Sequence, residues 1–452
     1  MRKNASPTQL GTENIGTLLM QYAVPAIIAM TAASLYNITD SIFIGHGVGK
    51  NALTGLGITF PLMNLAAAFG SMAGIGASTL LSIRMGQNDY KSANLILGNV
   101  VILNIITGIS FGVIALIFLE PVLLFFGASE ATLPYASQFM HIILAGNVIS
   151  HIYFGLNAVL RASGQPEKAM YATLFTVGIN LILNPLFIFV FKWGIRGSAL
   201  ATIISQCVML VWQYSLFQSK DSFLHFTKEG MKLKWNIVKD SVLIGLPPFL
   251  MNAASCVIVI LINTGLKRTS GDDAVGAYTV VNRVAMLFVM IVIGFNQGMQ
   301  PIAGYNFGAK KYDRVISVFW RTVRYATVIM ISGFALLELF PDMVVSIFTS
   351  DPALKELAIT GFRIVFISYP IIGFQMVTSN FFQSMGMAKK SIFLSLTRQV
   401  LFLIPMLIFL PNIWGVHGVW WSMPISDAIS SVVATIMLVI QMRKFKQMRY
   451  EE

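Results

Sequence analysis

Apolar stretches long enough to cross a lipid bilayer recur from one end of the chain to the other. A bilayer core requires roughly 20 helical residues per crossing. The alternating pattern of a membrane barrel is absent, so helices must satisfy the backbone hydrogen bonds. The pattern predicts an all-α membrane protein with twelve spans, at residues 19–44, 54–80, 93–118, 134–158, 169–190, 197–217, 240–264, 275–302, 318–340, 355–381, 391–411 and 416–441.

The chain also repeats its own pattern after 222 residues. Four landmark residues recur at this spacing, as the pairs Pro25 and Pro247, Gly86 and Gly308, Tyr90 and Tyr312, and Gly164 and Gly386. The motif Trp193-Gly194 recurs as Trp414-Gly415 at a step of 221. Each copy holds an even number of crossings, so both enter the membrane in the same sense. We predict two pseudo-symmetric six-helix bundles, an internal symmetry that is typical of secondary transporters.

The boundary between the two copies is predicted in a polar, lysine-rich stretch, Ser219–Asp240. This divides the chain into an N-terminal lobe at 1–218, a cytoplasmic linker at 219–239, and a C-terminal lobe with a cytoplasmic tail at 240–452. Such a linker is long enough for two bundles to rock against each other.

The composition supports the membrane assignment and explains the charge. Of all residues 56% are hydrophobic and only 11% are charged, whereas soluble domains are about a quarter charged. The net charge of +12 follows from basic residues gathered in the N-terminus, alternate loops and the tail, which predicts cytoplasmic termini by the positive-inside rule. It does not indicate nucleic-acid binding. The opposite loops hold only Lys50, Lys192, Arg196, Lys267, Arg268 and Lys355.

Enzymatic and cofactor-dependent functions find no support in the sequence. Cys207 and Cys256 both lie inside predicted spans and offer no disulfide or metal-ligand spacing. The five histidines are scattered, and no phosphate-binding Walker loop is present. We therefore expect no cofactor, no enzymatic activity and no direct use of ATP.

Ionisable residues inside the hydrocarbon layer are expensive, so they are the first candidates for function. Two acids lie deep in predicted spans, Asp40 in the first and Asp427 in the last. The basic residues at depth all belong to the second lobe: Arg283, Arg363 and Arg398. Asp427 can therefore serve in a structural ion pair with Arg398 or Arg283, or in binding. Asp40 has no such neighbour, and only a proton or a bound cation would neutralise it.

Polar residues accompany Asp40 at helical spacing. Asn180 and Asn184 share a face of the fifth span, and Thr202 lies in the sixth. With Asp40 they form a predicted ion-coupling site, whose oxygen atoms suit a hard cation; Asp40, Asn180 and Thr202 would be the ligands if the ion is Na⁺. Hydrogen bonding between helices is the alternative role of the neutral residues. Substrate-cavity residues are predicted at Tyr36, Asn37, Asn157, Asn282, Gln297 and Gln375.

Several motifs together resemble the multidrug and toxic compound extrusion (MATE) family over essentially the whole chain. They are the duplicated six-helix layout, the two Trp-Gly motifs, and the runs Tyr36–Gly45, Arg161–Gly164 and Asn180–Leu186. The resemblance implies two bundles around a central cavity and export of cationic or amphipathic compounds in exchange for H⁺ or Na⁺. It also implies that Asp40 is the coupling acid of the first helix. Many relatives carry Asp where this chain has Asn184, which leaves the choice of ion open.

The leading hypothesis is a cation-coupled multidrug antiporter that acts as a monomer in the inner (plasma) membrane, with small-molecule drugs or organic cations as substrates. The alternative is a lipid-linked oligosaccharide flippase, because related superfamilies share the two-bundle layout and the second lobe carries the three arginines. A non-transporting scaffold or receptor would not depend on Asp40. An intramembrane enzyme fits least, since no acid–base or metal set converges.

Overall fold

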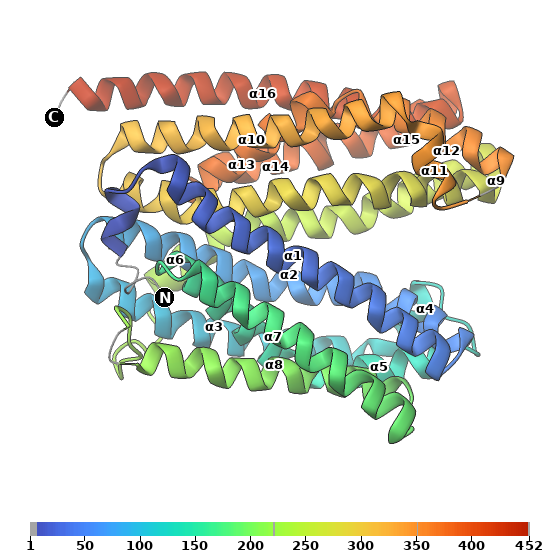
Figure 1. The fold of residues 1–452 in the computed structure, drawn as a ribbon, viewed down its shortest axis with the longest axis horizontal. Helices are drawn as coiled ribbons and strands as arrows, with labels where there is room; N and C mark the ends of the chain where they lie inside the picture. The colour runs from blue at the N-terminus through green and yellow to red at the C-terminus, as the bar shows by residue number, and fades with distance from the viewer. Residues whose placement is uncertain (1–6, 220–221, 350, 451–452) are drawn as a thin grey trace. The chain divides into compact units, whose positions relative to one another are not determined.

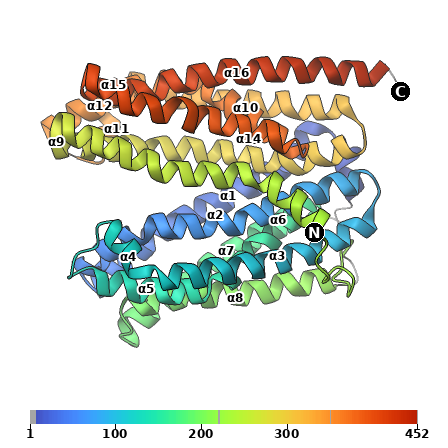
Figure 2. The same cartoon turned by 180° about the vertical axis from the view of Figure 1, so that it is seen from behind.

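A computed structural model describes residues 7–219, 222–349 and 351–450, and every regular element in these ranges is a helix (Figures 1 and 2). The first part of the chain forms η1 (Pro7–Gly11), α1 (Ile15–Gly47), α2 (Lys50–Gly86), α3 (Tyr90–Ile117), α4 (Leu119–Phe125), α5 (Leu133–Ala145), α6 (Asn147–Ala162), α7 (Pro166–Pro185), η2 (Leu186–Val190) and α8 (Ile195–Gln218). The second part forms α9 (Trp235–Gly308), α10 (Tyr312–Leu339), α11 (Pro341–Ser346), α12 (Pro352–Phe366), α13 (Tyr369–Ser384), α14 (Ala388–Leu396), η3 (Thr397–Leu403), α15 (Ile404–Trp414) and α16 (Val416–Tyr450).

The predicted all-α membrane fold is confirmed. Ten helical segments of the described chain are long and apolar enough to cross a membrane, and two bent helix pairs bring the number to twelve. The bends, which the hydrophobic pattern did not predict, measure 56° between α5 and α6 and 53° between α12 and α13. Gly146 lies at the first bend and Ser368 at the second, 222 residues later. The duplication therefore includes the shape of the spans as well as their order.

The helix α9 contains two of the predicted spans. Its backbone leaves the helical conformation at Ser270 and Gly271, where Gly271 has a φ of 74°. A positive φ is readily adopted only by glycine. The repeat-related Gly49, between α1 and α2, has a φ of 119°. Both copies thus use a glycine to turn the chain between their first and second spans.

The described residues pack into two compact units. Unit 1 comprises residues 1–12 and 28–249, and unit 2 comprises residues 13–27 and 250–452. Two of the three breaks fall inside helices, two residues after Pro25 in α1 and two residues after Pro247 in α9. The beginning of α1 therefore packs within unit 2 and the beginning of α9 within unit 1. The predicted lobe boundaries at 218 and 240 mark the ends of the duplicated sequence, whereas the two units are defined by compact packing. The lobe boundaries therefore stay a prediction.

Small residues allow these helix beginnings to pack closely. In unit 1, a Cβ at Gly76 would meet the backbone of Ser241 and Gly245. In unit 2, a Cβ at Gly298 would lie 2.7 Å from the backbone nitrogen of Ala23. These are the same contact in the two copies, since each residue of one pair is 222 positions from its counterpart. Close approach of helices at small residues is the usual basis of packing in membranes.

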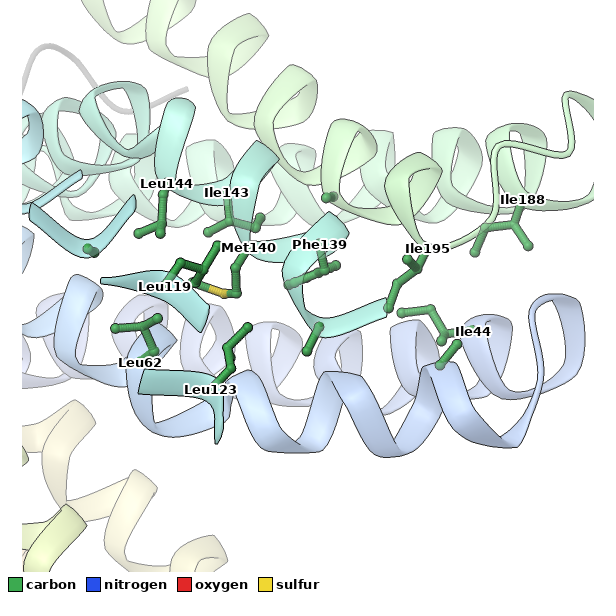
Figure 3. Close-up of a cluster of buried hydrophobic side chains, with 14 residues drawn as sticks. Ile44, Leu62, Leu119, Leu123, Phe139, Met140, Ile143, Leu144, Ile188 and Ile195 are labelled. Carbon is green, nitrogen blue, oxygen red and sulfur yellow. The ribbon is translucent and has the colours of Figure 1, made fainter. Parts of the chain in front are cut away.

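An apolar cluster at one end of unit 1 holds α1, α4, α5 and α8 together (Figure 3). Its buried members include Ile44, Leu123, Phe139 and Ile195. Lipid is as apolar as these side chains, so the cluster stabilises the bundle through van der Waals contact rather than exclusion from water. Ile44 lies one helical turn beyond Asp40 on α1. The cluster therefore fixes the segment of α1 that carries the predicted coupling acid.

Candidate ion-coupling site

Asp40 lies in the interior of unit 1, between α1, α7 and α8. Only 6% of the residue is exposed. Its Oδ1 accepts a hydrogen bond from the Ser198 hydroxyl at 2.5 Å and another from the Asn184 amide. Within residues 7–219, 222–349 and 351–450, no basic side chain forms an ion pair with it. The carboxylate is thus held by two neutral donors in a buried setting.

A second set of polar groups lies about one helical turn away. The Tyr36 hydroxyl and the Thr202 hydroxyl are 2.7 Å apart. The Asn180 amide donates to both, at 3.4 Å to Tyr36 and 3.2 Å to Thr202. These contacts join the same three helices as the contacts of Asp40. The structure therefore brings together all four residues predicted for ion coupling, and Tyr36 with them.

Two amide oxygens of the site are buried without a hydrogen-bond donor among the described residues, Oδ1 of Asn180 and Oδ1 of Asn184. An unpaired buried oxygen costs free energy. Together with the Asp40 carboxylate and the Thr202 hydroxyl, these oxygens form the kind of ligand set that a hard monovalent or divalent cation accepts. The residues present therefore fit a bound cation at this position.

Helical periodicity explains how the sequence builds this site. Residues four positions apart lie on one helix face, and the pairs that meet here have this spacing: Tyr36 and Asp40 on α1, Asn180 and Asn184 on α7, and Ser198 and Thr202 on α8. Ser198 contacts Asp40, and the sequence analysis missed it. Its position one turn before Thr202 is the signal that identifies it.

The other predicted cavity residues have different surroundings. Asn37 is exposed and its amide donates to the backbone oxygen of Ala33 on its own helix. Asn157 is buried and donates to the backbone oxygen of Ala169, linking α6 to α7. Three further residues belong to unit 2, where Gln375 is buried and Asn282 and Gln297 are half-buried. Their role in a substrate cavity stays a prediction.

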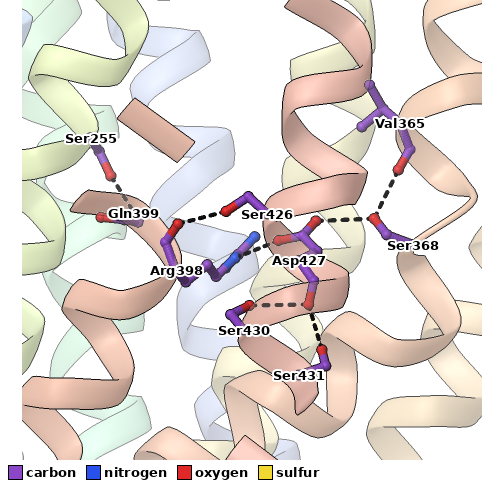
Figure 4. A network of polar contacts seen from close by, with 9 residues as sticks. All are labelled: Ser255, Val365, Ser368, Arg398, Gln399, Ser426, Asp427, Ser430 and Ser431. Carbon is purple, nitrogen blue, oxygen red and sulfur yellow. Dashed lines mark hydrogen bonds and ion pairs between the residues drawn. The ribbon is translucent and has the colours of Figure 1, made fainter. Parts of the chain in front are cut away.

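Asp427, the second deep acid, lies in an ion pair (Figure 4). Its Oδ1 accepts from Nε of Arg398 at 2.7 Å, and its Oδ2 accepts from the Ser368 hydroxyl at 3.0 Å. These contacts link α13, η3 and α16, so the pair has the geometry of the predicted structural bridge. The two remaining deep arginines, Arg283 and Arg363, are exposed.

Comparison with known proteins shows the family. The MatE family matches residues 25–186 and 247–408, two stretches that begin 222 residues apart. Similar curated proteins include the multidrug export protein MepA of Staphylococcus haemolyticus, which is 25% identical over 92% of this chain and 91% of its own. MepA of Staphylococcus aureus strain MRSA252 is 24% identical, over 93% of both chains.

Solved structures agree in fold. An outward-facing multidrug resistance MATE family transporter of the MOP superfamily superposes with a TM-score of 0.91, at 24% identity, over 98% of this chain and 100% of its own. A MATE protein crystallised in a bent conformation gives a TM-score of 0.92 at 24% identity, over 98% and 99% of the two chains. The repeat, the twelve spans and the two matched stretches lead to one conclusion: the chain belongs to the MatE family of membrane transporters.

Proposed function

We propose that the protein is a secondary active multidrug efflux antiporter, which exports cationic or amphipathic compounds in exchange for H⁺ or Na⁺. The observation that carries this proposal is Asp40, a buried carboxylate with two neutral hydrogen-bond donors and no ion pair among the described residues. The similar proteins from staphylococci are multidrug export proteins, which supports the substrate class.

Asp40 supplies the coupling. A carboxylate in a dry interior is costly unless a cation neutralises it. The site therefore favours binding of a cation from whichever side of the membrane has access to Asp40. Release of the cation leaves a charge that the hydrogen bonds from Asn184 and Ser198 stabilise. The loaded and empty forms therefore differ in how α1 packs against α7 and α8. This difference lets an ion gradient drive the change of access that expels the substrate.

Both coupling ions fit the proposal for separate reasons. The unpaired oxygens of Asn180 and Asn184 would complete a Na⁺ site with Asp40 and Thr202, since Na⁺ prefers oxygen ligands. A proton needs only the carboxylate itself. The chain has a single acid in this site, because residue 184 is an asparagine.

The setting of the protein is part of the proposal. We place it in the plasma membrane as a monomer, with both termini in the cytoplasm and no cofactor. Large apolar side chains on the outside of α3, such as Val113 and Ile117, are 51% and 68% exposed. Lipid chains would cover such side chains.

Transport in proteoliposomes tests the function. Purified protein is reconstituted, and uptake of a fluorescent organic cation is measured under a proton gradient or a Na⁺ gradient imposed separately. We expect one gradient to drive uptake by the wild-type protein, and Asp40→Asn to abolish uptake while the protein still inserts and folds. The matched control is the double variant Asp427→Asn with Arg398→Gln, which removes the other buried acid together with its partner. Gradient-driven uptake by Asp40→Asn at the wild-type rate would refute the proposal.

One observation favours the flippase as a second candidate. Unit 2 contains a pocket of about 480 Å³ lined by Asn263, Thr264, Lys267, Arg268 and Val275. Arg268 donates to the side chain of Asn412 at 2.7 Å, which fixes its guanidinium. Two adjacent cations suit a phosphate group. Translocation of a fluorescent pyrophosphate-linked lipid in the same liposomes, lost in Arg268→Gln and retained in Asp40→Asn, would favour this function over drug export.

A further inference from the structure

One face of α7 is polar from Thr173 to Asn184. Thr173, Thr176, Asn180 and Asn184 follow one another at spacings of three and four residues, which places them on a single face. We call these four residues the α7 seam. Every member contacts a polar group on another helix of unit 1, so the seam is more than a sequence pattern.

The contacts of the α7 seam follow one another at steps of about one helical turn, from Asp40 to the far end of α6. Asn184 bonds to Asp40, and Asn180 bonds to Tyr36 and Thr202. One turn further, the Thr176 hydroxyl donates to the Tyr153 hydroxyl at 3.1 Å.

The series ends at a basic residue. The Asn157 amide lies 3.4 Å from the Thr173 hydroxyl, and Nη1 of Arg161 donates to Oδ1 of Asn157 at 2.5 Å. Arg161 stands in the last turn of α6, next to the turn at Gly164. By the proposed topology this turn is cytoplasmic, so the series connects the coupling acid with the cytoplasmic end of unit 1.

The groups along the α7 seam suit the passage of a small cation. Hydroxyl and amide oxygens can hold a cation, and hydroxyl groups both donate and accept hydrogen bonds. Tyr153, Asn157 and Asn180 are 3%, 5% and 2% exposed, so the series is enclosed. The step from Asn180 to Thr176 spans one helical turn, about 6 Å along the axis, and Oδ1 of Asn180 is unpaired at this step.

The ionisable groups along the path are few. Asp40 and Tyr36 lie at one end, and Tyr153 and Arg161 at the other. His151, also on α6, instead contacts the backbone oxygen of Ala66 on α2 at 2.9 Å. No second carboxylate contacts the α7 seam among the described residues, so a cation released from Asp40 meets no competing acid before the end of α6.

We propose that the α7 seam, with Tyr153 and Asn157, is the path by which the coupling cation moves between Asp40 and the cytoplasmic end of unit 1. This inference rests on the proposed function. An antiporter must release its coupling cation on the side opposite to its entry. The seam gives that release a route inside one lobe.

The second copy of the repeat argues against a purely structural role. There, the Ser379 and Ser395 hydroxyls are 3.0 Å apart, at the positions that correspond to Asn157 and Thr173. The counterparts of Asn180 and Asn184 are Phe402 and Met406. Thr176 corresponds to Arg398, which forms an ion pair with Asp427. The second copy therefore has an ion pair and two apolar residues on this face, and a series of neutral polar groups follows it only in unit 1.

Removal of single hydroxyl groups tests the path. Thr176→Val and Tyr153→Phe keep the shape of each side chain, and Thr176→Ser keeps the hydroxyl. Ser395→Ala is the matched control in the second copy. Each variant is reconstituted, and both the affinity for the fluorescent substrate and the initial rate of gradient-driven transport are measured. The gradient is the one that drives the wild-type protein.

We expect Thr176→Val and Tyr153→Phe each to lower the transport rate about tenfold, the effect of losing one polar oxygen that would hydrogen-bond or ligate the moving ion. Substrate affinity should be unchanged, and Thr176→Ser and Ser395→Ala should transport at the wild-type rate. Wild-type rates in both hydroxyl-free variants would overturn the path, and so would an equal loss in Thr176→Ser. Either result would leave the proposed function intact if Asp40→Asn still abolishes coupling.

Discussion

Two buried carboxylates, one in each unit, have opposite surroundings. Asp427 in unit 2 is neutralised by Arg398 at 2.7 Å and by the Ser368 hydroxyl. Asp40 in unit 1 has only neutral donors among the residues that the structure describes. A buried ion pair is a closed arrangement, in which neither charge is available to a further ion. An acid without a counter-ion can still bind one, which agrees with the proposed coupling role of Asp40 and with a structural role of Asp427.

The two acids are also not repeat counterparts. Asp40 corresponds to Ile262, which is 1% exposed, while Asp427 corresponds to the region of Ser205 and Gln206. In unit 1 the side chain of Gln206 accepts a hydrogen bond from the Ser150 hydroxyl at 2.5 Å. A neutral hydrogen bond thus lies in the region that corresponds to the Asp427–Arg398 ion pair of unit 2. Duplication thus preserved the helices, bends and glycine contacts, whereas the intramembrane chemistry diverged between the copies.

The largest effect is expected from an acid placed at the counterpart of Asp40. Ile262→Asp would bury a carboxyl group in a part of unit 2 where the counterparts of Asn180 and Asn184 are the apolar residues Phe402 and Met406. We expect a loss of about 5 kcal/mol in unfolding free energy. Thermal denaturation in detergent micelles measures this. Ile262→Val is the control, with an expected loss of about 1 kcal/mol. If Ile262→Asp melted at the wild-type temperature, unit 2 would accept a buried acid at this position as unit 1 does at Asp40, and the proposed difference between the two units would be wrong.

Breaking the ion pair of unit 2 comes next. Asp427→Asn leaves Arg398 without its charged partner, which should cost about 4 kcal/mol in stability. The double variant with Arg398→Gln should recover much of that loss. By contrast, Asp40→Asn removes an unpaired acid and should leave the melting temperature near the wild-type value. A strong loss of stability in Asp40→Asn would show that this acid is structural too.

The glycine contacts of the two units allow a smaller test. Gly76→Ala would press a methyl group against the backbone of Ser241, and such overpacking costs about 2 kcal/mol. Gly298→Ala meets Ala23 in the same way, so its cost should be similar. Melting temperatures of the two variants compare the copies directly. Gly57→Ala is a control, since no atom lies within 4 Å of its added Cβ.

The smallest effect concerns a helix cap that only one copy has. The Asp89 carboxylate accepts from the backbone nitrogen of Ser92 at 3.0 Å and caps α3. Its repeat counterpart Lys311 makes no side-chain cap to α10. We expect Asp89→Ala to cost about 1 kcal/mol in stability, and melting temperatures above pH 5 measure this.

The pH dependence of that cap has a definite sign. Hydrogen bonds from Ser92 hold the pKa of the Asp89 carboxyl below its usual 3.8. Because the folded-state pKa is lowered, the contribution is fully present above the usual value of 3.8 and is lost as pH falls through the folded-state pKa. The stability difference between wild type and Asp89→Ala should therefore vanish in strong acid. If the stability difference between wild type and Asp89→Ala were unchanged at low pH, neither the charge of Asp89 nor its cap on α3 would account for that difference.

The sequence by itself determined the class of fold, the number of spans and the duplication, and it selected Asp40 as the candidate coupling acid. These follow from local rules, because hydropathy, glycine turns and an isolated acid are visible along the chain. The spacing of Asn180 and Asn184 also placed both on one helix face. Even the missed Ser198 was one turn from a residue already selected.

Only the tertiary structure decided which polar groups meet. The sequence did not distinguish Arg398 from Arg283 as the partner of Asp427, since that choice depends on how η3 packs against α16. Nor did it predict the bends at Gly146 and Ser368, or that the first residues of α1 pack within unit 2 and those of α9 within unit 1. These features arise from contacts between residues far apart in the chain, and in a membrane such contacts are set by close packing rather than by hydropathy.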